Sequence, residues 1–383
     1  TRELDTLIGE NLLKDGVKLN TGGVVIVKTN VQKGEELKEI FWEDKPDHRI
    51  LSVAYNVAKE FGFKRVILVS KDINLRMKAK SIGIMSEDYE TGKVKDIDEL
   101  YKGKNLKENI QSEVIDEIYK SGFIDFDQAG VEVDPMPNEY FILRNGVKSI
   151  LTTYNKEKHA FTLVEKRRAY GIQPRNAEQA FALNALMDPK INLVTLSGKA
   201  GTGKTLMALA AALEKRRDYK QILLARPIIP LGNRDIGYLP GDVKSKLDPY
   251  MQPLFDNLTV IKHQFKEESP DFGRINDMLN NEKLLITPLA YIRGRSLNKV
   301  FFIVDEAQNL TPHEVKTVIT RAGEGTKVIF TGDPYQIDTP YLDSRSNGLT
   351  YLIDKIKGQE IYAHVTMEKG ERSELAELAS NLL

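Results

Sequence analysis

Six short apolar runs alternate with helical patterns over the second half of the chain. Each run lacks the alternating polar residues of a half-buried strand, so it is typical of a strand that helices cover on both faces. With crossovers between them, such strands predict one doubly wound parallel sheet, and we expect an α/β domain over residues 166–383. The runs are NLVTLS (192–197), QILLAR (221–226), KLLITP (283–288), VFFIVDE (300–306), KVIFTGD (327–333) and IYAHVTM (361–367).

Residues 1–100 show a second α/β pattern. VVIVKT (24–29) is a short apolar run after the turn signal of residues 20–23, and apolar side chains recur at helical spacing from Ile50 to Phe61. RVILVS (65–70) then predicts a fully buried strand, and INLRMKAKS (73–81) predicts a second helix. This order of helix, strand and helix favours a parallel sheet.

The segment between these two domains, residues 101–165, has a different pattern. Charged helical stretches give way to β-rich runs that are separated by an Asn-Gly turn at 145–146 and an Asn-Lys-Glu turn at 155–157. We predict a small β-rich connector here, whose role the sequence does not indicate.

Composition excludes several classes of function. The 383 residues include 55 Lys plus Arg and 55 Asp plus Glu, so no net charge attracts the chain to nucleic acid, and any such binding needs local patches. The absence of Cys excludes disulfides, thiolate catalysis and zinc–thiolate sites, as is common in the cytoplasm. No apolar run reaches the roughly 18 residues of a membrane-spanning helix. We expect a soluble cytoplasmic protein with no membrane partner.

Residues 198–205 read GKAGTGKT, which fits the P-loop pattern G-x-x-x-x-G-K-[ST], and they lie between an apolar run and a helical pattern. The glycines let backbone N–H groups surround phosphate oxygens, and the helix N-terminus adds its positive dipole end. We expect Lys204 to contact the outer phosphates of ATP and Thr205 to bind Mg²⁺. All eight residues are candidates for nucleotide binding: Gly198, Lys199, Ala200, Gly201, Thr202, Gly203, Lys204 and Thr205.

Three further segments carry candidate residues for the same site. Asp305 and Glu306 end the run VFFIVDE, where Asp305 would hold Mg²⁺ through water and Glu306 would polarise the attacking water. Gln336 follows KVIFTGD and would touch the γ-phosphate, although it could also be a turn residue after Asp333. Gln179 lies one helix before the P-loop, where its amide could bond an adenine edge or simply face solvent.

Four features of the second half belong together: Gln179, GKAGTGKT, DEAQNLTP and GDPYQID. With IIPLGNRDIGYLPGD and RGRSLN in the expected order between them, the chain resembles the PhoH family of ATPases from Tyr170 to Leu383. The resemblance implies a P-loop NTPase core that is RecA-like and similar to the first motor domain of superfamily-one helicases. It also implies Mg²⁺-dependent ATP hydrolysis that is linked to single-stranded RNA.

The first 100 residues resemble the PIN nuclease fold in DHRILSVAYNVAKEFGF and VILVSKDINLRMKAKSIGI. That resemblance implies a cluster of about four acids around Mg²⁺ or Mn²⁺, of which Asp47 and Asp72 are candidates, although each could instead cap a helix. PIN domains carry Asp-Thr-Asn on their first strand and a Glu after it. We find no counterpart of either in this sequence. We therefore expect an incomplete metal site and little or no RNA cleavage.

Residues 166–383 have room for one motor domain, so a second chain must complete the ATP site. Arg372 is the candidate arginine finger, with Arg293 and Arg295 as alternatives, and such contacts predict a homo-oligomeric ring such as a hexamer. The basic clusters EKRRAY, EKRRDYK and IRGRSLNK could line an RNA path or be solvated faces.

Two functions remain open, and a third is weaker. The chain is an ATP-driven RNA helicase with an attached ribonuclease domain, or it is a regulatory module in which ATP controls the binding of a partner. A metabolite kinase is less favoured, because Gln336 is present and no lid is evident.

Overall fold

The computed structural model describes residues 16–19, 22–28, 37, 40–41, 43–89, 94, 96–97, 99–229, 243–292 and 294–370, with the backbone alone for 243–247. The chain divides into two compact units, Thr1–Thr91 and Gly92–Leu383. Each unit is described by itself.

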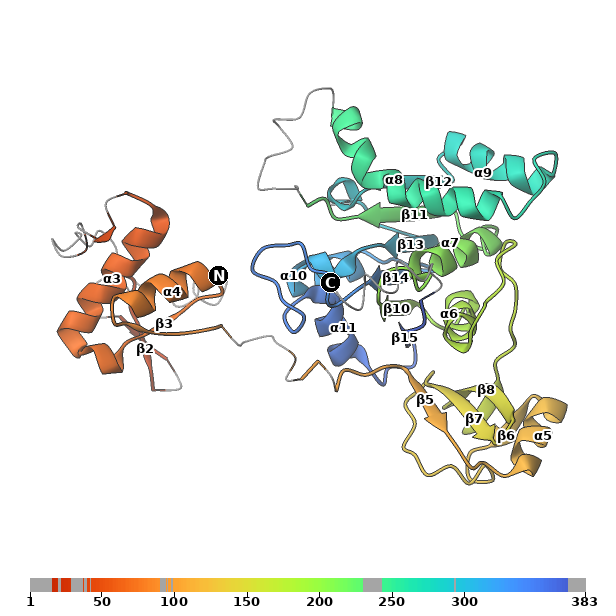
Figure 1. Cartoon of the computed structure of the whole chain (residues 1–383). Helices are drawn as coiled ribbons and strands as arrows, with labels where there is room; N and C mark the ends of the chain where they lie inside the picture. Colours follow the sequence, from red (N-terminus) through yellow and green to blue (C-terminus); the bar gives the residue numbers. More distant parts are fainter. Residues whose placement is uncertain are drawn as a thin grey trace. The chain divides into compact units, whose positions relative to one another are not determined.

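The second unit is built on a six-stranded sheet (Figure 1). The strand order is β12-β11-β13-β14-β10-β15, and all neighbouring strands are parallel. All six expected runs form these strands, which confirms the predicted α/β sheet. The carboxyl ends of parallel strands meet at one edge, so the segments that follow them come together. The strands are β10 (Leu193–Gly198), β11 (Gln221–Arg226), β12 (Leu284–Pro288), β13 (Val300–Val304), β14 (Lys327–Gly332) and β15 (Tyr362–Met367).

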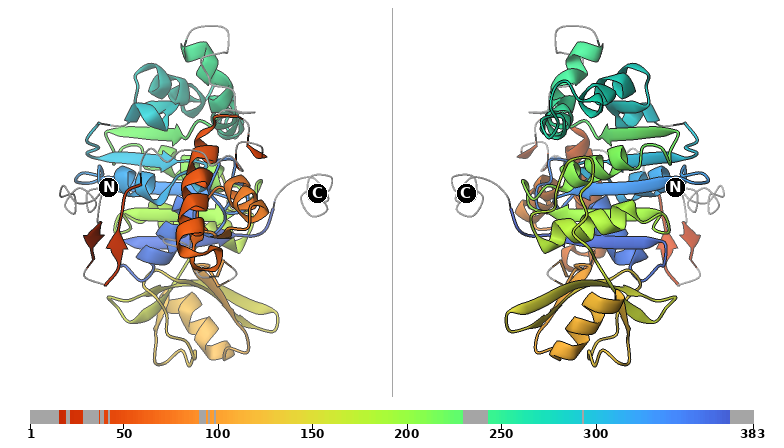
Figure 2. Two further views of the ribbon diagram at one scale, coloured as in Figure 1. Left: turned by 90° about the vertical axis from the view of Figure 1, so that its left-hand side faces the viewer. Right: turned by 90° about the vertical axis from the view of Figure 1, so that its right-hand side faces the viewer.

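Helices cover both faces of this sheet. One face packs against α6 (Ala177–Met187), α7 (Lys204–Glu214), α8 (Val243–Lys262) and α9 (Pro270–Asn280). The other face packs against α10 (Pro312–Ile319), α11 (Gly348–Ile356) and a short 3₁₀ helix, Leu289–Ile292. In the right-hand view of Figure 2, α6 and α7 lie in front of the sheet.

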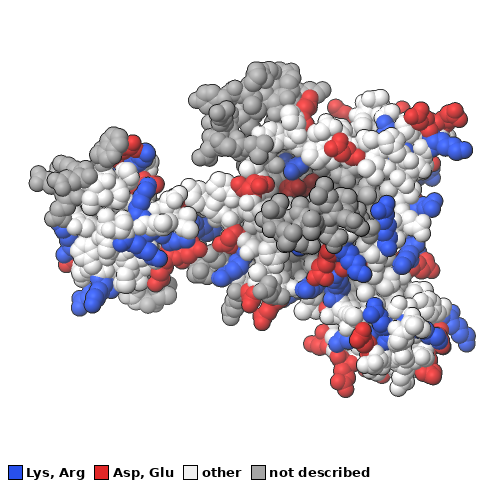
Figure 3. Space-filling model, viewed as in Figure 1, with Lys and Arg blue, Asp and Glu red and all other residues white. Residues whose placement is uncertain are grey.

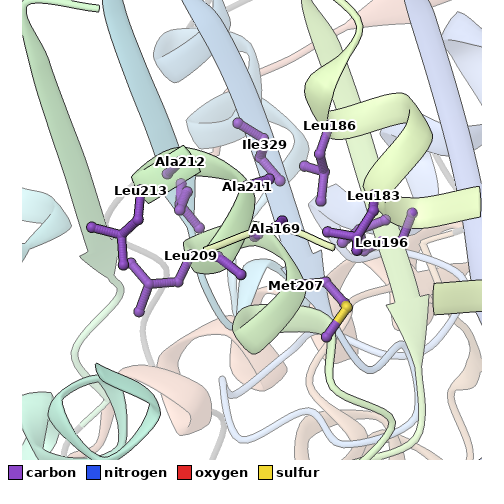
Figure 4. Close-up of a cluster of buried hydrophobic side chains, with 14 of the residues drawn as sticks. Ala169, Leu183, Leu186, Leu196, Met207, Leu209, Ala211, Ala212, Leu213 and Ile329 are labelled. Atoms are coloured by element: carbon purple, nitrogen blue, oxygen red, sulfur yellow. The ribbon is translucent and has the colours of Figure 1, made fainter. Parts of the chain in front are cut away.

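The two cores explain why the strands are apolar throughout. Leu193 belongs to the core beneath α10 and α11, whereas the next residue, Val194, belongs to the core beneath α6 and α7. Successive side chains of a strand point to opposite faces, so a strand with two covered faces needs apolar residues at every position. Figure 4 shows the packing of α6 and α7 side chains, including Leu183 and Met207, around Leu196 and Ile329 of the sheet.

A five-stranded sheet precedes the large sheet within the second unit, in the order β5-β7-β8-β9-β6. The β-rich runs on either side of the Asn-Gly turn form a hairpin: β7 (Tyr140–Asn145) and β8 (Lys148–Asn155) pair antiparallel, with Asn145 opposite Lys148. The remaining strands are β5 (Lys104–Lys107), β6 (Phe123–Asp125) and β9 (Ala160–Leu163). The charged stretch before the hairpin contains helix α5 (Ser112–Ser121), whose Val114, Ile115 and Ile118 pack on this sheet.

The first unit contains both predicted helices, as α3 (Pro46–Phe61) and α4 (Ile73–Ser81), and they pack in a small core around Leu51 and Leu75. The predicted parallel pairing is also present, between β3 (Ile67–Val69) and β4 (Met85–Glu87). The run at 24–29 contributes only β2 (Val24–Val25), which pairs antiparallel with β1 (Val17–Lys18).

The expectation of a fully buried strand at 65–70 is wrong for the described residues. Ile67 and Val69 are 45% and 52% exposed, whereas Leu68 between them packs against the core of α3 and α4. The strand is therefore covered on one face only, and its uniformly apolar sequence does not show which face that is.

The described helices include none that is long and apolar enough to cross a membrane.

Candidate functional site

The glycines of residues 198–205 have backbone conformations that other residues rarely adopt. Strand β10 ends at Gly198 with φ +144, and a Cβ atom there would lie 1.9 Å from the carbonyl oxygen of Met367. Gly201 and Gly203 have φ values of +82 and +92. Helix α7 then begins at Lys204, so the N–H groups of its first turn have no partner within the helix. This loop and helix terminus form the anion site that the sequence predicts.

Lys204 lies folded over the loop. Its side chain is buried, and its Nζ donates hydrogen bonds to the carbonyl oxygens of Gly198 at 2.6 Å and Lys199 at 2.9 Å. The loop is closed further by Thr202, whose Oγ1 donates to the Lys199 carbonyl at 3.0 Å. The ammonium charge is therefore held within the phosphate loop.

Asp305 joins this loop to the centre of the sheet. It follows β13 directly, and its Oδ1 accepts hydrogen bonds from Thr205 Oγ1 at 2.7 Å and from Thr331 Oγ1 at 2.6 Å. Asp305 is 6% exposed. A hydroxyl and a carboxylate in direct contact are oxygen ligands of the kind that Mg²⁺ accepts, with nucleotide phosphates and water completing the set. The residues present therefore fit a magnesium–nucleotide complex.

Glu306 lies among groups that change its pKa in opposite directions. Its backbone is left-handed, with φ +54, and its carboxylate contacts Arg226 Nη2 at 3.4 Å and Gln308 Nε2 at 2.5 Å. Burial and the neighbouring charge of Asp305 raise the pKa of Glu306, against the opposing effects of Gln308 and Arg226. A carboxylate with a raised pKa is suited to accept a proton from water.

Gln308 connects this carboxylate to the loop after β14. It is fully buried, and its Nε2 also donates to the carbonyl oxygen of Gln336 at 2.9 Å. Its Oε1 accepts the backbone N–H of Asp333 at 3.1 Å. These bonds fix the loop that carries Gln336 beside Glu306.

The structure brings most of the predicted residues to one cavity of about 230 Å³ at the carboxyl edge of the sheet. Lys204, Thr205, Asp305, Glu306 and Gln336 line it together. The cavity is thus surrounded by a phosphate loop, a hydroxyl–carboxylate pair and a second carboxylate. This arrangement is suited to the hydrolysis of a nucleoside triphosphate.

Gln179 is buried, so the solvent-facing alternative is wrong. It is 3% exposed, its Nε2 donates to the carbonyl oxygen of Thr202 at 3.2 Å, and its Oε1 accepts the N–H of Arg175 at 2.9 Å. The amide therefore joins α6 to the phosphate loop. Its contact with an adenine edge stays a prediction.

The candidates for the second metal site take part in other contacts. Asp47 forms an ion pair with Lys78 at 3.1 Å, and Asp72 caps α4 by accepting the N–H groups of Asn74 and Leu75. The described part of the chain contains no group of three or more His, Cys, Asp or Glu that could hold a metal ion. A metal-binding role for these two acids stays a prediction.

Of the three candidate arginine fingers, Arg295 alone lies among the described residues. Arg295 is exposed and does not line the cavity. Arg293 and Arg372 lie outside the described residues.

Sequence reasoning missed Arg226, Gln308 and Thr331. Arg226 ends a buried strand and Thr331 lies within one, so both are polar residues in apolar runs near the carboxyl edge of the sheet. Gln308 follows Asp305 and Glu306 within the motif DEAQNLTP. Arg226 and Thr331 contact the acids that follow the neighbouring strand β13, and Gln308 contacts the loop that follows β14, so the strand order is needed to find these partners.

Comparisons with known proteins show the family of this chain. Residues 171–382 match the family described as PhoH-like protein, and residues 2–90 match the PIN domain. Protein PhoH2 of Bacillus subtilis is 42% identical over 99% of this chain and 87% of its own length. Protein PhoH2 of Mycolicibacterium smegmatis is 36% identical over 94% of this chain and 80% of its own length.

Among solved structures, the Pif1 helicase from Candida albicans aligns with 55% of this chain and 43% of its own. Its identity is 15% and its TM-score is 0.29, so the likeness is too weak to support an inference. The family match covers more than half of the chain and agrees with relatives along nearly its full length. The chain belongs to the PhoH-like protein family and carries an N-terminal PIN domain.

Proposed function

We propose that the PhoH-like P-loop NTPase domain hydrolyses ATP with Mg²⁺ and couples hydrolysis to the binding and unwinding of RNA. The observation that supports hydrolysis most strongly is the contact between Thr205 Oγ1 and Asp305 Oδ1, in the cavity that Lys204 and Glu306 also line. These four residues come from two segments about 100 positions apart, and they are the groups that phosphoryl transfer from a nucleotide requires.

Each residue has a separate task in this proposal. Lys204 turns its ammonium from the loop carbonyls to the outer phosphates, and Thr205 with Asp305 holds the metal. Bound Mg²⁺ offsets the negative charge of the phosphate oxygens. Glu306 accepts a proton from the attacking water, and Gln336 orients the γ-phosphate. Water adds to the γ-phosphorus as the bond to the β-phosphate oxygen breaks, which releases ADP and inorganic phosphate.

Support for an RNA partner comes from the position of two predicted basic clusters. Over the described surface visible in Figure 3, Lys and Arg are interspersed with Asp and Glu, so a local cluster is needed. Residues 165–168 and 214–220 together contain seven Lys or Arg and three acids. The structure joins them: Glu214 accepts the N–H of Tyr170, and the Arg216 guanidinium lies 5.0 Å from the Tyr170 ring centroid. Arg167 and Arg217 are both exposed.

The experiment is to measure phosphate release from Mg-ATP with and without single-stranded RNA. We expect severalfold stimulation in the wild type, and less stimulation but equal basal hydrolysis when Arg167 and Arg217 are both changed to Glu. Lys148→Glu is the matched control, because Lys148 pairs with Asp116 on the surface of the five-stranded sheet. Basal hydrolysis that RNA leaves unchanged would favour the alternative of a regulatory module that responds to a protein partner.

We further propose that the PIN domain acts on RNA as a ribonuclease with Mg²⁺ or Mn²⁺, in a form in which its metal site is complete. We also propose that copies of the chain assemble into a ring such as a hexamer, because the described residues form one motor-type sheet and a neighbouring chain would supply the arginine for the γ-phosphate.

A further inference from the structure

The edge of the five-stranded sheet lies against strand β15. The backbone N–H of Thr366 donates to the carbonyl oxygen of Lys102 at 3.0 Å. Gly103 has φ +69, and a Cβ atom at this position would lie 1.8 Å from the carbonyl oxygen of His364. The chain that leads into β5 is therefore in direct backbone contact with the strand that neighbours β10.

A buried cation connects this edge to two carboxylates of the NTPase domain. Lys104 Nζ contacts Glu178 Oε1 and, at 3.0 Å, Glu368 Oε2. The Lys104 and Glu178 side chains are 13% and 8% exposed, so solvent screens their charges only weakly. Glu178 Oε2 also accepts the N–H groups of Glu368 at 2.8 Å and Lys369 at 3.0 Å. Removal of Lys104 would leave a buried carboxylate without its cation.

Both carboxylates are one residue away from a contact with the phosphate loop. Gln179 follows Glu178 on α6, and its Nε2 bonds the carbonyl oxygen of Thr202 within the loop. Met367 precedes Glu368, and its carbonyl oxygen lies against Gly198, where the loop begins. A shift of either carboxylate would therefore move one side of the loop.

We infer that Lys104 is a positioning residue for nucleotide binding, through which the docking of the five-stranded sheet sets the shape of the phosphate loop. The inference rests on the proposed function and assigns the connector a role in it. Asp305 and Glu306 follow β13 and Gln336 follows β14, whereas Lys104 bonds Glu178 of α6 and Glu368 after β15. Loss of Lys104 should therefore weaken nucleotide binding while the hydrolytic groups keep their positions.

The test is equilibrium binding of a fluorescent ADP analogue in the presence of Mg²⁺, together with KM and kcat for ATP. For Lys104→Met we expect Kd and KM to rise by roughly tenfold, as a small misplacement of a binding group can do, and kcat to stay within about twofold. Lys104→Arg keeps the cation and should recover most of the affinity. Lys148→Met, which removes an exposed pair with Asp116 on the same sheet, should bind like the wild type.

Glu368→Gln is a milder second variant, because the Glu368 side chain is 52% exposed and Glu178 keeps its contact with Lys104. We expect a smaller loss of affinity in the same direction. Wild-type affinity in a folded Lys104→Met protein would overturn the inference, as would equal losses in affinity and kcat. If the wild type itself binds no nucleotide, the proposed function fails first and the inference fails with it.

Discussion

Neighbouring groups set the position and the pKa of Glu306, which we propose accepts a proton from water. A left-handed backbone at a residue other than glycine costs roughly 1 kcal/mol and turns the side chain away from the direction of the strand. Arg226 at the end of β11 and Gln308 then hold the carboxylate at the cavity. Burial beside Asp305 raises its pKa, so the proton that it accepts is bound more tightly than by an ordinary glutamate.

The raised pKa of Glu306 predicts how kcat falls at low pH. Glu306 must be ionised to accept a proton, so kcat should rise with pH through a midpoint above the ordinary value of 4.5. Arg226→Met removes a cation that favours ionisation and should shift the midpoint to higher pH. The measurement is kcat at saturating ATP from pH 4.5 to 8, and a midpoint that does not move in the variant would contradict this account of Glu306.

The residues found from the sequence and those found only in the structure differ in a physical way. Lys204 and Thr205 are fixed by local spacing, and Asp305 is marked because a charge ends an apolar run. The role of Thr331 depends on β14 lying next to β13, and that of Arg226 on β11 lying on its other side. Strand order in a sheet is set by long-range packing, so spacing along the chain does not show these partners.

At the scale of elements, one buried lysine joins helix α6 to the sheet. Lys327 begins β14 and is 2% exposed. Its Nζ donates to the carbonyl oxygens of Ala185 at 3.0 Å, Asp188 at 2.7 Å and Ile191 at 2.5 Å. The last carbonyl groups of a helix have no partner within it, so this ammonium satisfies the end of α6.

Lys327→Met should leave these carbonyl groups unpaired and lower the free energy of unfolding by about 3 kcal/mol. The melting temperature should fall by roughly 5 to 10 °C in thermal denaturation. Lys148→Met, at an exposed position, should change stability by no more than about 0.5 kcal/mol. A melting temperature equal to that of the wild type would mean that water or other donors replace Lys327.

The same lysine gives stability a dependence on pH. Burial lowers the pKa of Lys327 from 10.5 to about 7, so the folded state releases this proton before the unfolded chain does. The free energy of unfolding of the wild type should therefore increase between about pH 7 and 10.5, relative to Lys327→Met. Parallel pH curves for the two proteins would contradict the burial of a titrating lysine here.

Strands were predicted best where helices cover both faces of their sheet. All six strands of the large sheet follow from their apolar runs, whereas the run at 65–70 has the same pattern with one exposed face. Apolar composition indicates burial, but which neighbours cover a strand depends on the rest of the unit.

At the scale of the whole molecule, the two candidate metal ligands of the first unit are engaged in other contacts. Asp47 is paired with Lys78 and Asp72 caps α4, and either acid would have to give up such a contact to bind a metal ion. We expect weak or no RNA cleavage with Mg²⁺ or Mn²⁺, measured on a labelled single-stranded RNA. Robust cleavage that Asp72→Asn abolishes would contradict this, and would mean that other acids such as Glu3 or Asp5 complete the site.

Assembly is predicted from the number of motor domains. The described residues hold one six-stranded sheet, and an arginine from a second chain would raise turnover by roughly 10³ to 10⁵ where such fingers operate. ATPase activity per subunit should rise steeply with protein concentration. Arg372→Ala should lower turnover without weakening ATP binding, and mixing it with Lys204→Ala subunits should restore some activity. Mixed rings that form but stay inactive would exclude Arg372 as the finger.

The central claim is that the cavity at the carboxyl edge of the sheet hydrolyses ATP. Phosphate release from Mg-ATP by the wild type, Lys204→Ala and Glu306→Gln at equal concentration tests it most directly. We predict turnover by the wild type alone, because Lys204→Ala loses the cation that contacts the phosphates, and Glu306→Gln still binds ATP but no longer accepts the proton of water. Phosphate release at the wild-type rate by either folded variant would contradict the account.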